Sequence, residues 1–230
     1  MLFRSIYEGL SEWYLGTIDA CNATMAEAIS LAKELNDLHA LAVALWHSGW
    51  LAYFQRDPGE VERFSSNLIE LSTRQNFAFW LAGGEVHRGW ARSAFGETAQ
   101  GISWIEDGLG DYRATGSLLM VPYLLALKSE AFYLADRTSE ALEAIEEAQV
   151  LVERSEERSS SAELYRLRGV FLTALGADET QIEDSFLAAI RTAREQKAIS
   201  LVSRAETTYA EYRRQKANAS EGRGFRLPLC

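Results

Sequence analysis

The sequence contains few of the residues on which several classes of protein depend. It has only two cysteines, Cys21 and Cys230, at opposite ends of 230 residues. Two distant cysteines with no histidine nearby give neither a disulfide framework nor a zinc site. Only three prolines occur, and long stretches rich in Ala, Leu and Glu favour helix over strand.

Long apolar runs and an excess of basic charge are also missing. No stretch approaches the roughly eighteen uninterrupted apolar residues of a membrane span, so we expect no contact with a membrane. Glu8 and Glu12 interrupt the first apolar run, which is therefore unlike a signal peptide, and we expect a cytoplasmic protein. The formal net charge is −10, and such a surface repels phosphate backbones. We therefore expect no nucleic-acid partner.

What the sequence does contain is a repeat of about forty residues. His-x-Gly-Trp occurs at 47–50 and again at 87–90. Gly49, Gly89 and Gly169 fall at equivalent places in apolar segments with helical periodicity, and their spacings are close to one and two repeats. A repeat of two helices is typical of an α-helical solenoid. The apolar segments span 38–57, 77–96, 118–137, 162–178 and 199–215, with a weaker copy of the whole unit at 2–36.

These segments predict an all-α fold, a right-handed α-α superhelix of about five antiparallel helix pairs. No Gly/Ser-rich break divides the chain, so we expect a single repeat domain over residues 1–215. Residues 216–230 show no periodicity and predict a disordered tail. Pro122 leaves two alternatives: its helix begins there, or it begins at a Ser117 cap and kinks. The predicted left-handed helix ends are Gly96, Gly116 and Gly176.

No group of residues has the residue types and spacing expected of a metal, cofactor or catalytic site. His47 and His87 repeat in equivalent positions, but metal sites need three or four ligands, and His39 sits in a different phase. We therefore interpret them as packed polar residues. Gly84-x4-Gly89 has the spacing of a phosphate-binding loop but lacks the Lys and Ser or Thr that should follow. The glutamates are spread around exposed helix faces, so we expect no enzyme activity and no cofactor.

The first helices of the repeat supply the candidate binding residues. Positions three before, one after and four after the repeated Gly share one face of a helix, which would line a groove. On this basis Trp46, Trp50, Tyr53, Trp90 and Arg166 are predicted to contact a partner. Stacked aromatics suit extended peptides, sugars or an amphipathic helix. The alternative is that the same rings form the core of the solenoid.

Helix pairs of this length resemble tetratricopeptide (TPR) repeats. The best match is "AELYRLRGVFLTALGAD", where Tyr165, Gly169, Leu172 and Gly176 stand at the places of an aromatic, a glycine, a large apolar residue and a turn glycine. The other pairs depart from that motif, for example at Glu130, which replaces the glycine.

The phrases "RGWA", "YRATG", "PYLLAL" and "ELYRLRG" resemble the C-terminal repeat region of large bacterial signalling ATPases, over residues 10–213. In that family an adenylate-cyclase-like or DNA-binding domain and a P-loop ATPase precede the repeats. The resemblance implies a non-enzymatic regulatory module that binds a protein or peptide partner. The alternative is a sensor of a small effector that controls a linked ATPase or cyclase.

The sequence after Arg214 departs from this family, in which another helix pair is expected. A missing pair would leave an apolar end face on residues 199–213. That face predicts a homodimer through the C-terminal end of the array.

Overall fold

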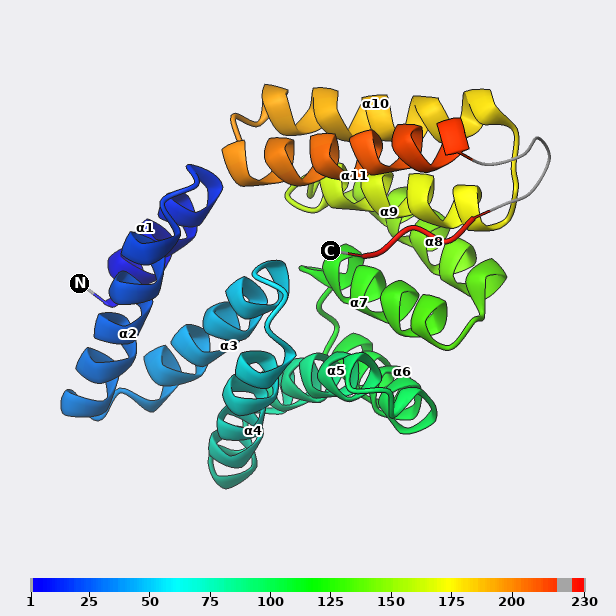
Figure 1. Ribbon diagram of the computed structural model, residues 1–230. Coiled ribbons are helices and arrows are strands. Elements are labelled where there is room, and N and C mark those ends of the chain that lie inside the picture. Colours follow the sequence, from blue (N-terminus) through cyan, green and yellow to red (C-terminus); the bar gives the residue numbers. More distant parts are fainter. Residues whose placement is uncertain (1, 219–224, 230) are drawn as a thin grey trace. The chain divides into compact units, whose positions relative to one another are not determined.

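The computed structural model describes residues 2–218 and 225–229. Within them every regular element is an α-helix (Figure 1), which confirms the all-α prediction. The helices are α1 (Leu2–Tyr14), α2 (Ile18–Glu34), α3 (Leu38–Phe54), α4 (Pro58–Gln75), α5 (Ala78–Ala94), α6 (Thr98–Ala114), α7 (Val121–Leu134), α8 (Thr138–Ser155), α9 (Ser161–Ala174), α10 (Glu179–Glu195) and α11 (Ile199–Asn218).

A residue with positive φ follows each helix from α1 to α10, and this explains the forty-residue repeat. From Gly16 to Gly176 these residues recur every twenty positions, so two helices with their turns make one repeat. The predicted left-handed ends at Gly96, Gly116 and Gly176 are confirmed. Glycine adopts this backbone freely, and asparagine and aspartate adopt it more readily than other residues. The series is Gly16, Asn36, Arg56, Asn76, Gly96, Gly116, Asp136, Glu156, Gly176 and Lys197.

Short polar side chains and prolines fix several helix starts. The Asp57 carboxylate accepts a hydrogen bond from the Glu60 amide at 3.0 Å, and Pro58 occupies the first turn of α4. Helix α7 begins at Val121 with Pro122 in its first turn, so the first of the two alternatives for this proline is the observed one. A proline in the first turn breaks no helical hydrogen bond.

Consecutive helices pack as antiparallel pairs, and the chain divides into two compact units. The N-terminal unit, Met1–Ser117, contains the pairs α1–α2, α3–α4 and α5–α6. The C-terminal unit, Leu118–Cys230, contains the pairs α7–α8 and α9–α10, followed by α11. We expected one repeat domain over 1–215, and the structure instead has a unit boundary between Ser117 and Leu118.

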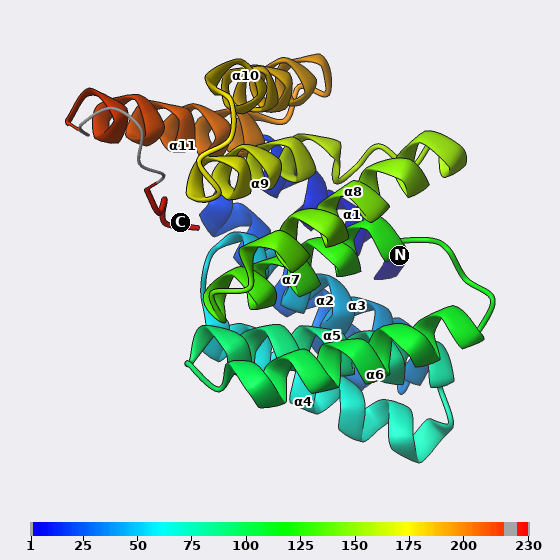
Figure 2. The ribbon, with the colours of Figure 1, turned by 90° about the vertical axis from the view of Figure 1, so that its right-hand side faces the viewer.

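Within each unit the first helices of successive pairs form one layer. In the C-terminal unit α9 lies against both α7 and α11 (Figure 2), whereas no Cα atom of α8 comes within 8 Å of a Cα atom of α10. In the N-terminal unit α3 likewise contacts α1 and α5, and α2 does not reach α4. Helices that lie closer together mark the inner side of a curved array. The first helices therefore form the inner layer of each unit.

The glycines of the repeat lie where helices approach closely. A Cβ added at Gly89 would lie 2.6 Å from the Gly101 carbonyl oxygen, so α5 and α6 touch through their backbones. At Gly169 an added Cβ would lie 2.7 Å from the Phe186 ring. Any larger residue at these places would push the paired helices apart.

The prediction of a disordered tail from residue 216 is wrong for the described part. Helix α11 continues to Asn218, and residues 225–229 pack with Leu227 and Leu229 buried. Residues 219–224 and Cys230 lie outside the described residues. None of the described helices combines the length and apolar character needed to cross a membrane.

Candidate functional site

The four aromatic residues predicted to line a groove lie in the interior of the N-terminal unit. Trp46 stacks on His87 with ring centroids 4.4 Å apart, and Tyr53 meets Trp90 at 5.0 Å. Trp50 packs against other aromatic rings of α1 and α3. None of the four side chains is more than 5% exposed. This corrects the expectation that they offer open faces to a partner, because their rings join the first helices to one another as core.

The fifth predicted residue, Arg166, is also buried, in a cluster of charges between α9 and α11. Its guanidinium donates two hydrogen bonds to the Glu163 carboxylate, at 2.8 and 2.7 Å. The same carboxylate accepts from Arg204 Nε at 3.1 Å, and Arg166 donates to the Thr208 hydroxyl. Arg166 and Glu163 are only 1% and 2% exposed. The opposite charges stabilise each other where water is excluded.

Next to this charged cluster, residues 225–229 lie on the inner layer of the C-terminal unit. We call these residues the docked segment; it runs beside α11 and back towards α7 (Figures 1 and 2). The Tyr133 hydroxyl of α7 donates to the Leu227 carbonyl oxygen at 2.9 Å. Arg204 of α11 donates to the Leu229 carbonyl oxygen at 3.3 Å. Side chains of two first helices therefore bind the backbone of the docked segment.

The side chains of the docked segment alternate between buried and exposed. Leu227 and Leu229 are 1% and 9% exposed, whereas Arg226 before them and Pro228 between them are exposed. A period of two is that of extended backbone, and the proline restricts Leu227 before it to extended conformations. The docked segment therefore inserts two leucines into the inner layer in the manner of a strand-like peptide.

Two residues, Arg226 and Phe225, hold the first half of the docked segment. The Arg226 guanidinium lies over the Tyr133 ring at 4.2 Å, donates to the Tyr133 carbonyl oxygen and pairs with Asp136. Phe225 stacks on Tyr212 of α11 with centroids 5.8 Å apart. Burial raises the pKa of Tyr133, partly opposed by the Arg226 charge, so its hydroxyl stays protonated and able to donate.

We call the surface that holds the docked segment the inner groove, formed by Tyr133 of α7 and by Arg204, Thr208 and Tyr212 of α11. The sequence indicated Arg166 nearby, and the structure links it to the inner groove through Glu163 and Arg204. Tyr133 and Arg204 were missed, because their positions do not follow the repeated glycine and their ligand lies in the segment expected to be disordered.

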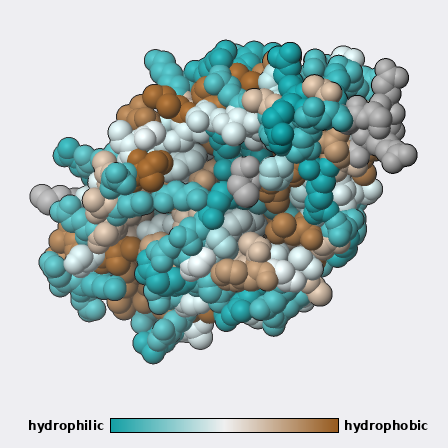
Figure 3. Space-filling view, viewed as in Figure 1, coloured by the Kyte–Doolittle hydropathy of each residue, from teal (hydrophilic) through white to brown (hydrophobic). Residues whose placement is uncertain are grey.

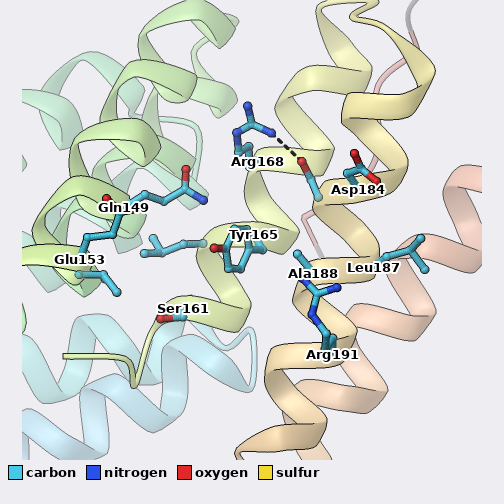
Figure 4. A pocket seen from close by; sticks show the side chains of 12 residues that line it. Gln149, Glu153, Ser161, Tyr165, Arg168, Asp184, Leu187, Ala188 and Arg191 are labelled. Carbon is cyan, nitrogen blue, oxygen red and sulfur yellow. Dashed lines mark hydrogen bonds between the residues drawn. The ribbon is translucent and has the colours of Figure 1, made fainter. Parts of the chain in front are cut away.

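A second hollow lies between α8, α9 and α10, on the other side of α9 (Figure 4). Its volume is about 550 Å³. Tyr165 and Arg168 of α9 point into it, and Arg168 donates to the Ser185 hydroxyl of α10 at 2.8 Å. Arg191 and Glu153 add one charge of each sign to its rim. The mixed lining suits a small polar molecule rather than a long chain.

The repeated histidines take part in packing. His47 Nδ1 lies 2.8 Å from the Val43 carbonyl oxygen, one turn earlier, and His87 stacks on Trp46. Burial lowers the pKa of His87 to about 3, with a smaller effect from His47, and burial also lowers the pKa of His47. Both rings are therefore neutral at pH 7. Over residues 2–218 and 225–229, no three His, Cys, Asp or Glu side chains converge to suit a metal ion.

The expected apolar end face on residues 199–213 is largely polar. Ile199 is the one large hydrophobic residue strongly exposed in that range, and Tyr212 is buried. The face of the molecule in Figure 3 likewise shows hydrophobic residues as separate small patches among hydrophilic ones. The homodimer predicted from an apolar end stays a prediction, and this surface gives it no support.

Comparison with known proteins gives one distant relative. No protein-family model matches the chain. The chain is 23% identical over 205 residues to uncharacterized protein R02095 of Rhizobium meliloti strain 1021, and the match covers 88% of the chain. It covers 20% of that protein, so the chain spans about a fifth of the relative's length.

Proposed function

We propose that this chain is a non-enzymatic repeat module that binds an extended segment of a protein partner in the inner groove. The observation that carries this proposal is the docked segment, held through its backbone by Tyr133 and Arg204. Recognition of backbone carbonyls, with pockets for alternate side chains, is a general way of binding extended peptides.

The charges around the inner groove support this function. Arg204 is fixed by Glu163, which is itself fixed by Arg166, so the donor to the ligand carbonyl is already oriented before a ligand arrives. A preoriented donor reduces the entropy that binding must otherwise overcome. The buried cluster thus has a role in binding as well as in joining α9 to α11.

The context of the module is part of the same proposal. The chain matches a stretch of a relative about five times its length, which supports the hypothesis that such repeats belong to larger proteins. Together with the resemblance to signalling ATPases, this favours a regulatory module. Its partner segment would belong to another protein, or to another domain of the same protein. The cytoplasm is the compartment we propose.

Binding of a synthetic peptide tests the proposal. A fluorescein-labelled peptide with the sequence of residues 225–229 is titrated with the full chain, and fluorescence anisotropy is recorded. We expect saturable binding. In chains that also carry Leu227→Asp/Leu229→Asp, so that residues 225–229 do not compete, Tyr133→Phe should weaken binding about fivefold, because a hydrogen bond contributes on the order of 1 kcal/mol. Tyr165→Phe in the same background is the matched control, since Tyr165 lies in the other hollow. Equal binding with and without Tyr133→Phe in that background would contradict the proposed binding in the inner groove.

A sensor of a small effector is the second candidate, because the hollow of about 550 Å³ between α8, α9 and α10 has the size of a ligand pocket. Its two arginines face two carboxylates, Glu153 and Asp184, so the lining favours a small polar compound that offers both donors and acceptors. A metabolite library screened by thermal shift tests this function: an effector should raise the Tm of the wild type but not of Arg191→Ala. A library without any such compound argues against it.

A further inference from the structure

Resting on the proposed function, we infer that residues 225–229 are a built-in ligand of the inner groove. They block the groove until a partner segment of the same chemistry displaces them. The inferred partner is an extended segment with the pattern of Arg226, Leu227 and Leu229. It has a basic residue, an apolar residue directly after it, and a second apolar residue two positions further on.

The contacts of the docked segment define this ligand class. The groove binds the carbonyls of positions 227 and 229, which any extended peptide offers, and buries the side chains of the same two positions. The guanidinium of Arg226, the residue before Leu227, lies over the Tyr133 ring and pairs with Asp136. Position 228 is exposed and its proline has no N–H to donate. Besides the stacking of Phe225 on Tyr212, specificity therefore rests on positions 226, 227 and 229.

A hollow adjoins the inner groove beside the docked segment. A hollow of about 450 Å³ remains beside Leu227 and Pro228, lined by Thr207, Glu211 and Arg214 of α11. A partner segment with bulkier side chains at these positions would fill space that the docked segment leaves open. Such a partner gains contacts with the polar and charged side chains of α11 that residues 225–229 lack, and these contacts give it the advantage needed for displacement.

The docked segment is tethered close to the groove that it fills. Only the six residues 219–224 separate α11 from Phe225 along the chain. A short tether gives its ligand an effective concentration in the millimolar range. For a peptide whose Kd in solution is about 100 μM, the tethered copy would weaken binding of a free peptide about tenfold.

The same labelled peptide distinguishes this inference from the proposed function. It is titrated with the full chain as wild type and as Leu227→Asp/Leu229→Asp, in which two buried leucines become charged and the docked segment is released. Leu175→Asp is the matched control, because it makes the same change at an exposed leucine. We expect the double variant to bind about tenfold more tightly than the wild type, and the control to bind as the wild type does.

Each outcome has a separate meaning. Equal affinity of the double variant and the wild type overturns the inference and leaves peptide binding in place. Absence of binding to all three chains overturns the proposed function together with the inference. Far-UV circular dichroism establishes that the variants keep their helices. If the double variant loses helix, Leu227→Ala/Leu229→Ala replaces it and must bind more tightly than the wild type.

Discussion

At the scale of the residue, glycine spacing determines how closely paired helices approach. Gly89 faces the Gly101 carbonyl oxygen, whereas an added Cβ at Gly110 of the same helix pair would meet no atom within 4 Å. We expect Gly89→Ala to lower the free energy of unfolding by about 1–3 kcal/mol through overpacking. Gly110→Ala should raise it by up to about 1 kcal/mol, because alanine favours helix. Urea unfolding of the two variants measures both, and a stabilising Gly89→Ala would contradict the packing described for α5 and α6.

A buried histidine should make stability depend on pH. The pKa of His87 is about 3 in the folded chain, below the ordinary value of 6.5, because burial disfavours the charged ring. The unfolded chain therefore binds the proton first as pH falls, and stability present above pH 6.5 is lost progressively below it, by up to about 1.4 kcal/mol per unit. Unfolding free energies between pH 7 and 5 should fall less steeply for His87→Gln than for wild type. An unchanged slope would show that His87 is accessible, and exposed His39→Gln is the control.

Local geometry explains which residues could be predicted from sequence. Gly96, Gly116 and Gly176 were identified as helix ends because the left-handed backbone itself selects glycine. The aromatic face of α3 and α5 was also identified from the sequence, but its burial was not. Periodicity shows which side chains share a face, yet it does not show how tightly the neighbouring helices cover that face. The rings of Trp46 and Trp90 are therefore core where a groove was expected.

At the scale of the element, the charged cluster fastens α11 to α9. Glu163→Gln would leave Arg166 and Arg204 facing a neutral amide in a buried site. We expect a loss on the order of 3 kcal/mol in the free energy of unfolding. Glu206→Gln is the control, because its ion pair with Arg194 is exposed and contributes at most about 1 kcal/mol. Similar Tm values for the two variants would contradict a structural role of the buried cluster.

The inner groove could not be predicted from sequence patterns. All first helices were placed correctly, because apolar periodicity and turn residues act locally. The docked segment has no helical periodicity, and it is held by single contacts from Tyr133 and Arg204 that only the folded C-terminal unit brings together. A short segment of this kind is ordered by its groove rather than by its own sequence.

At the scale of the whole molecule, the boundary between the two units should be a preferred site of proteolysis. Leu118 and Leu119 at this boundary are 59% and 60% exposed, and they lie outside any helix. We expect brief chymotrypsin treatment to cleave first near these residues and to give two fragments that resist further digestion. Mass spectrometry identifies the cut. First cleavage within α3 or α9 would contradict the division into two compact units.

The central claim is that the inner layer of first helices holds an extended segment, and nuclear Overhauser effects measure this contact directly. In the full chain with labelled phenylalanine and tyrosine rings, we predict cross-peaks between the stacked rings of Tyr212 and Phe225, whose centroids lie 5.8 Å apart. Excess unlabelled peptide with the sequence of residues 225–229 should diminish these cross-peaks. Their absence from the free chain, with the helices intact, would contradict the account.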